Sequence, residues 1–240
     1  MKNMNLPSYP LGMLIAIASQ ESKKLSEQFL LESLAITGNH RFQNVAFIST
    51  EMEQETFHKI ALSNQKQLVY NDIEKTENGN YSNASICLPK NSLLFLDLPD
   101  KSLYRNNDAV LDIQHIKRMI VPLKTKYDVA TIIIDNIDKV ECSLMGRNLL
   151  WQTNISNTAN YEDWRERKHE YIISLLFYMA RKFNLRIIFG KQMKEKTTLP
   201  IEISHIKYMN FGNAYDMIDE IIFFNENGSL QKLKTSEDLY

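Results

Sequence analysis

Acidic and amide residues follow several apolar runs of this sequence, and such residues at strand ends can perform phosphate and metal chemistry. Asp135 comes directly after Ile-Ile-Ile, where a carboxylate can hold a water ligand of Mg²⁺ in a nucleotide site. Glu51 follows another run and could orient or deprotonate an attacking water, while Asp97 and Gln192 end two more. From spacing alone, helix capping or simple solvent exposure explains these acids equally well.

Short apolar runs alternate with segments of helical periodicity. Their richness in Ile, Val and Phe predicts strands at residues 14–18, 45–49, 93–96, 130–134, 186–189 and 220–224. Helices are predicted around residues 25–34, 113–123 and 171–179. Runs that are apolar at every position indicate strands covered on both faces, so we expect an α/β fold with a doubly wound, mostly parallel sheet. The carboxyl ends of such strands form one ligand-binding edge.

We expect one domain over residues 1–240. A chain of 240 residues with 44% hydrophobic content can bury one large core. Two polar stretches without periodicity, residues 74–85 and 141–163, are predicted to be exposed loops, and a last strand is predicted at residues 229–234.

Composition excludes several classes of protein. The 28 Lys and Arg against 29 Asp and Glu give a formal net charge of −1, so a nucleic acid would need a local basic patch. Cys87 and Cys142 have no metal-ligand spacing, which fits a reducing compartment and excludes a disulfide scaffold. No apolar run approaches the roughly 20 residues that span a bilayer, so we expect a cytoplasmic protein without membrane contact.

The order of these segments resembles the RecA-like motor domain of DnaB-type replicative helicases. Gly12 and the run after it, followed by residues 45–52, are similar to that family's first strand, phosphate loop and second strand ending in Ser-Leu-Glu-Met. Residues 93–99 resemble its third strand with an Asp-x-Pro ending, and residues 131–138 fall where the Walker B strand belongs. Residues 175–192 resemble the helix and strand before a Ser-Gln sensor, and the likeness continues to about Phe224.

The resemblance implies a P-loop NTPase fold and an ATP-dependent ring motor acting on DNA, with nucleotide sites shared between subunits. ATP and Mg²⁺ would be its cofactors. Glu51, Asp135 and Gln192 would be catalytic, and Ser26 would bind the metal with Asp135. We expect no counterpart of the family's N-terminal collar domain, because only about ten residues precede Gly12.

The phosphate loop departs from that family. The motif Gly/Ala-x-x-x-x-Gly-Lys-Thr corresponds here to residues 19–26, which read Ser-Gln-Glu-Ser-Lys-Lys-Leu-Ser. Lys24 replaces the glycine that lets backbone N–H groups approach phosphates, and Leu25 replaces the phosphate-binding lysine. The sequence therefore predicts weak or lost ATP binding. The remaining candidates for phosphate contact are Ser22, Lys23, Lys24 and Ser26.

Two groups of lysines are candidates for binding phosphate elsewhere. Lys232 and Lys234 fall where the family places a Lys-x-Arg pair for a neighbour's nucleotide, although lysines that guard an exposed edge strand explain them as well. Residues 165–196 contain nine Lys or Arg against three Glu. We expect single-stranded DNA to contact Lys191, Lys194 and Lys196. A solvated helix face and loop is the equal alternative.

Three functions follow from these observations. One is an active helicase motor with an unusual phosphate loop. The second is a RecA-like module of DNA replication or DNA handling with weak or lost ATPase activity, which binds DNA or a helicase partner, or assembles with copies of itself. The third, a metal-dependent hydrolase using Glu51, Asp97 and Asp135, lacks a supporting histidine cluster, because the five His are scattered. The altered loop favours the second.

Overall fold

The computed structural model describes residues 9–38, 44–50, 93–96, 111–142, 158–193, 211–224 and 230–234. Within them the strands are β1 (Leu14–Ser19), β2 (Asn44–Ile48), β3 (Leu93–Leu96), β4 (Val129–Ile134), β5 (Arg186–Gln192), β6 (Glu220–Phe224) and β7 (Leu230–Lys234). The α-helices are α1 (Ser22–Gly38), α3 (Ile113–Thr125) and α5 (Thr158–Phe183), and the 3₁₀ helices are η3 (Ile137–Lys139) and η4 (Gly212–Met217).

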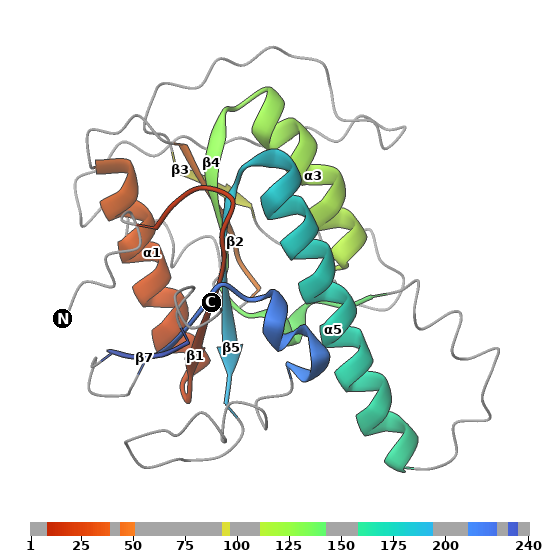
Figure 1. Cartoon of the computed structure of the whole chain (residues 1–240). Helices are drawn as coiled ribbons and strands as arrows, with labels where there is room; N and C mark the ends of the chain where they lie inside the picture. Colours follow the sequence, from red (N-terminus) through yellow and green to blue (C-terminus); the bar gives the residue numbers. More distant parts are fainter. Residues whose placement is uncertain are drawn as a thin grey trace, which may run out of the picture.

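The described strands form one sheet of seven strands in the order β3-β2-β4-β5-β1-β6-β7 (Figure 1). Strands β1 to β6 are parallel to one another, and β7 runs antiparallel to β6. Every predicted strand is present, with bounds within three residues of the prediction. The carboxyl ends of the six parallel strands therefore lie at one edge of the sheet.

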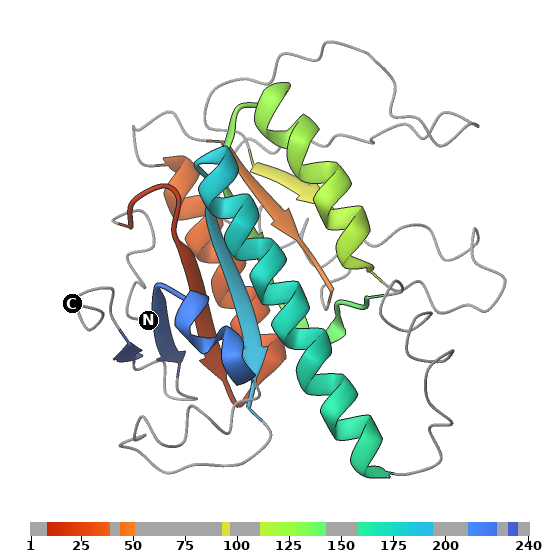
Figure 2. The same cartoon turned by 45° about the vertical axis from the view of Figure 1, so that its right-hand side comes forward.

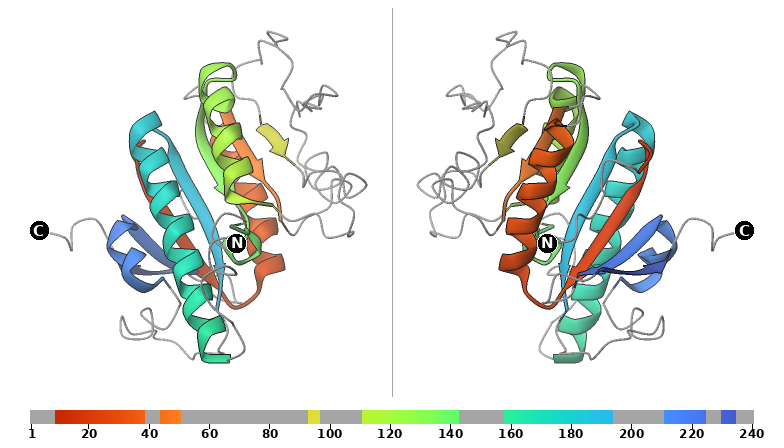
Figure 3. Two further views of the ribbon diagram at one scale, coloured as in Figure 1. Left: turned by 90° about the vertical axis from the view of Figure 1, so that its right-hand side faces the viewer. Right: turned by 90° about the vertical axis from the view of Figure 1, so that its left-hand side faces the viewer.

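Helices cover both faces of the sheet, as predicted. Figure 3 shows α3 and α5 on one face and α1 on the other, and Figure 2 shows α3 and α5 in front of the central strands. Alternate residues of β1 separate the two cores: Leu14 and Ala16 pack with α3 and α5, whereas Ile15 and Ile17 pack with α1. The sheet is buried on both sides, which explains why its strands are apolar at every position.

Local signals define the helix ends. Asp112 caps α3, because its side chain accepts a hydrogen bond of 2.7 Å from the amide of Gln114. After α5 ends, Asn184 has a positive φ of 49° and Leu185 donates back to the carbonyl of Ala180, a common C-terminal arrangement. None of the helices in the described part of the chain is long and apolar enough to cross a membrane.

One predicted loop is partly wrong. Residues 158–163, expected in an exposed loop, form the first turns of α5. Glu141, at the start of the same predicted loop, pairs with Asp112 in a β-bridge, and the neighbouring Cys142 is buried. Both segments escaped notice because their polar residues lack a regular apolar period. The second predicted loop, residues 74–85, lies outside the described residues.

Truncation of Ile133 tests whether β4 is central. Ile133 is fully buried between Phe47 of β2 and Ile188 of β5. We expect Ile133→Ala to lower the free energy of unfolding by about 2 to 5 kcal/mol, because the substitution leaves a cavity in the core. Denaturant melts measure the change. Val121→Ala, at a site that is 45% exposed on α3, is the control and should change stability by less than about 0.5 kcal/mol.

Candidate functional site

The parallel strands bring the predicted edge residues together around Asp135. Strand β4 pairs with β2 and β5, so that Asp135 emerges between the ends of these two strands. The amide of Asp135 donates to the carbonyl of Ile48 at 3.2 Å. Gly190 lies so close that a Cβ added to it would be 1.9 Å from the Asp135 carbonyl oxygen. Only glycine permits this approach of β5 to β4.

The carboxylate of Asp135 is fully buried and is surrounded by hydrogen-bond donors from two other elements. One oxygen accepts from the hydroxyls of Ser49, at 2.9 Å, and Ser26, at 3.3 Å. The other accepts from the amide and the hydroxyl of Thr50, both at 2.6 Å. Two carboxylate oxygens offer about four acceptor positions, so these donors satisfy the group. We call Ser26, Ser49, Thr50 and Asp135 the Asp135 cluster.

The segment that corresponds to the phosphate loop is short and helical. Strand β1 ends at Ser19 and α1 begins at Ser22, so two residues connect them. The amide of Leu25 donates to the carbonyl of Glu21 at 3.1 Å, a bond of the first helical turn. The side chain of Leu25 is 1% exposed and packs in the core under α1. The backbone at these positions is therefore engaged in a helix instead of forming an open phosphate cradle.

The charged residues of this segment lie at the surface. Lys23 is exposed, and Lys24 forms an ion pair of 2.8 Å with Glu21, with side chains that are 53% and 40% exposed. An exposed pair of this kind contributes little to stability. The carboxylate of Glu21 nevertheless gives Lys24 a negative partner where the family's loop binds phosphate. The side chain of Ser22 is not among the described groups.

These residues fit only part of an ATP and Mg²⁺ site. Ser26 and Asp135, expected at the metal, do lie within hydrogen-bonding distance of each other. The phosphate half does not fit, because no glycine opens the loop and Leu25 is a buried hydrocarbon where a lysine is needed. The described residues also contain no group of three or more His, Cys, Asp or Glu side chains able to hold a metal ion. Glu51 and Asp97 lie outside them.

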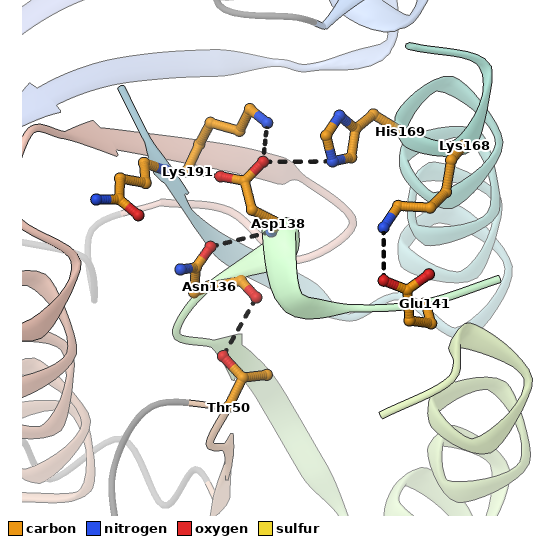
Figure 4. Close-up of polar contacts among 8 residues, drawn as sticks. Thr50, Asn136, Asp138, Glu141, Lys168, His169 and Lys191 are labelled. Atoms are coloured by element: carbon orange, nitrogen blue, oxygen red, sulfur yellow. Dashed lines mark hydrogen bonds and ion pairs between the residues drawn. The ribbon is translucent and has the colours of Figure 1, made fainter. Parts of the chain in front are cut away.

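A second polar cluster, which the sequence did not predict, centres on Asp138 in η3. Figure 4 shows its carboxylate between Lys191 of β5 and His169 of α5. Lys191 donates to the carboxylate oxygen that lies 3.3 Å from Nε2 of His169, and the other oxygen accepts from the amide of Gln192 at 3.0 Å. We call Asp138, His169, Lys191 and Gln192 the Asp138 cluster. The signal that could have revealed it is an acid three residues beyond Asp135, at the same edge.

The charge state of Asp138 reflects opposing effects. Burial disfavours the carboxylate and by itself raises the pKa of Asp138. The ammonium group of Lys191, with its hydrogen bond, His169 and the amide of Gln192 outweigh burial and hold the pKa below its ordinary value of 3.8. Asp138 is therefore a stable anion in the folded protein at neutral pH.

The position of Lys191 differs from the prediction. We expected it in a loop after the strand, but it lies inside β5, is 3% exposed and is paired with Asp138. A buried ammonium group in such a pair does not present its charge to a DNA phosphate. The expectation placed it wrongly because the strand continues to Gln192. Lys194 and Lys196 lie outside the described residues.

Other basic residues of the predicted patch also have partners within the fold. Lys168, which is buried, bonds Glu141 at 3.0 Å, and Arg181 pairs with Asp219 (Figure 4 shows the first pair). Arg186 is buried and donates to the backbone carbonyl of Tyr9 and to Thr131. Much of the basic excess in the described part of residues 165–196 therefore holds the fold together.

Lys232 is engaged at the far side of the sheet. Its ammonium group lies 3.5 Å from a carboxylate oxygen of Glu220 and 5.2 Å from the ring centre of Tyr9. Burial and a hydrogen bond with Glu220 raise the pKa of Tyr9 above its ordinary value. These contacts favour the edge-strand interpretation of Lys232, since β7 is the outermost described strand on that side. The side chain of Lys234 is not described.

Comparison with known proteins identifies the fold. No family model matches the sequence, and a search of curated proteins finds no match. Solved structures do match: a DnaB-like replicative helicase, studied with its interactions with primase, aligns with a TM-score of 0.59 and 15% identity over 95% of this chain and 54% of that chain. A second solved structure, an ATPase domain, aligns with a TM-score of 0.58 and 14% identity over 95% of this chain and 79% of that one.

These likenesses establish the α/β P-loop NTPase fold of DnaB-type, RecA-like motor domains, as the resemblance implied. This chain spans about half the length of the DnaB-like helicase chain that it matches.

Removal of one hydroxyl tests the Asp135 cluster. We expect Thr50→Val to lower the free energy of unfolding by about 1 to 3 kcal/mol, because a buried carboxylate loses a donor at 2.6 Å while the side-chain shape is kept. Denaturant melts measure it. The control is Thr125→Val, where the hydroxyl bonds only within its exposed helix end, and the expected change is below about 0.5 kcal/mol. Equal effects of the two substitutions would contradict the role assigned to the cluster.

Proposed function

We propose that this chain is a helicase-like RecA-fold protein of DNA replication or DNA handling that has weak or lost ATPase activity. It acts as an accessory module that binds single-stranded DNA, and it works beside a true helicase or with copies of itself. The support comes from a fold shared with replicative helicase motors together with a phosphate loop that lacks the groups for binding ATP.

The observation that carries the proposal is the start of α1. A phosphate cradle needs backbone N–H groups that point at the ligand from an open, glycine-containing loop. Here helical bonding is already established at Leu25, and that side chain is buried where a phosphate lysine would have to reach outward. ATP binding would require the first turn of α1 to unwind and a core leucine to be exposed.

An active motor is the alternative, and one observation favours it. Ser26 and Asp135 lie 3.3 Å apart in the arrangement expected of a hydroxyl and a carboxylate that share a Mg²⁺ site. On this alternative Glu51, Asp135 and Gln192 would carry the catalysis, with ATP and Mg²⁺ as cofactors. The same hydrogen bond is explained without any metal by the need of a buried carboxylate for donors.

Nucleotide titration decides between the two. We expect calorimetry to show that wild-type protein binds Mg-ATP about a hundredfold or more weakly than a variant with a repaired loop, Glu21→Pro with Lys24→Gly and Leu25→Lys. The glycine and proline free the first helical turn, and the new lysine supplies the missing charge. Circular dichroism verifies that the variant folds. Lys24→Ala, which breaks the exposed ion pair without opening the helix, is the control and should gain no affinity.

Tight binding of Mg-ATP by the wild type, or hydrolysis stimulated by DNA, would reject the proposal in favour of the active motor. A folded repaired variant that still fails to bind would contradict the argument that the loop alone prevents binding.

DNA binding has a separate test. We expect wild-type affinity for an oligothymidine to fall steeply with salt. Lys194→Glu with Lys196→Glu should reduce the affinity, and should reduce the salt slope by about 0.7 for each phosphate that the protein no longer touches. Fluorescence anisotropy at several salt concentrations measures this. The control with the same charge change is Lys117→Glu with Lys182→Glu, on the exposed faces of α3 and α5. Salt-independent binding, or equal losses in both variants, would count against this site.

A further inference from the structure

The end of β5 extends beyond its pairing with β4. The register of these strands ends at Ile134 and Phe189, whereas β5 continues to Gln192. In a parallel strand, successive amides point toward opposite neighbours. The amide of Met193 donates to Ser19 of β1 at 2.8 Å, so the amide of Gln192 points toward the side of β4. Its acceptor there is the carboxylate of Asp138, which takes the place of a strand carbonyl.

Asp138 is itself held by the ends of β2 and β4. Its amide donates to the side-chain oxygen of Asn136 at 3.0 Å, which caps η3. The hydroxyl of Thr50 donates to the carbonyl of Asn136 at 3.3 Å (Figure 4). Thr50 also belongs to the Asp135 cluster, so a continuous path of hydrogen bonds joins the two clusters.

The two last residues of β5 point in opposite directions. Lys191 is buried and reaches Asp138 on the side of α5, whereas Gln192 is exposed. By the alternation of a strand, Gln192 shares a face with Gly190, whose missing Cβ lies toward Asp135 and Leu25. The burial of Lys191 against Asp138 therefore fixes the direction in which the carboxamide of Gln192 projects. A carboxamide can donate to phosphates and bond to base edges.

We propose that Asp138 is a positioning residue, which holds the end of β5 so that Gln192 presents its carboxamide to single-stranded DNA at the carboxyl edge. The DNA part rests on the proposed function, while the positioning part stands on the geometry alone. His169 adds a contact from α5, so the helix and the strand end move as one unit.

A double-mutant cycle tests the proposal. Asp138→Ala, Gln192→Ala and the double variant are compared with the wild type for affinity to an oligothymidine. We expect each single substitution to weaken binding about tenfold, and the double variant to bind about as weakly as Gln192→Ala alone. Loss of fold stability alone would give multiplicative effects. The control is Glu141→Ala, which removes the partner of buried Lys168 on the same helix, and its effect should multiply with that of Gln192→Ala.

Amide hydrogen exchange separates the two parts of the proposal. We expect Asp138→Ala to speed exchange of the Gln192 amide about tenfold or more relative to the amides of β1, and Glu141→Ala to leave it unchanged. If Asp138→Ala does not fold, Asp138→Asn replaces it, with a smaller effect expected since one acceptor remains. If the wild type binds no DNA, the proposed function fails, yet faster exchange still supports positioning. Unchanged exchange, or independent effects in the cycle, overturns it.

Discussion

The arrangement of the carboxyl edge depends on a single buried charge. Asp135 is inaccessible to solvent, and a carboxylate in such a place is tolerated only when donors surround it. The donors come from α1 and from the end of β2, so both elements must stop where they do for Asp135 to be satisfied. Gly190 completes the requirement, because any larger residue would push β5 away from this group. The charge therefore determines the spacing of three strands and a helix.

A second ionic group extends this order outward. The Asp138 cluster joins η3, β5 and α5, and Thr50 is its link to the Asp135 cluster. Burial of Lys191 and His169 makes displacement of either costly, since a buried charge that loses its partner is strongly destabilising. The consequence is that Gln192, although exposed, extends from one of the more firmly held parts of the described edge. A surface group on a rigid support binds a ligand with little loss of conformational freedom.

The strands could be predicted well from the sequence because, in an α/β chain, continuous apolar runs are typical of strands that are covered on both faces. The approach of Ser26 to Asp135 could also be predicted, since the topology requires it. The prediction failed at Lys191, because a lysine after an apolar run is normally exposed and nothing local signals a buried partner 53 residues earlier. The early start of α1 was hidden for the same kind of reason: alignment to a known motif assumes a loop, whereas Lys24, Leu25 and Ser26 are compatible with helix.

The altered phosphate loop has the character of a replacement more than of random decay. Lys24 has Glu21 as a partner one helical turn away, and Leu25 fills the core beside Gly190. Ser26 is the position that keeps the residue type of the motif, and it is also the one that a buried Asp135 needs as a donor. Each residue thus has a local role that does not involve nucleotide. A RecA-like motor fold can lose its ligand and stay ordered when the groups once turned toward the ligand satisfy one another.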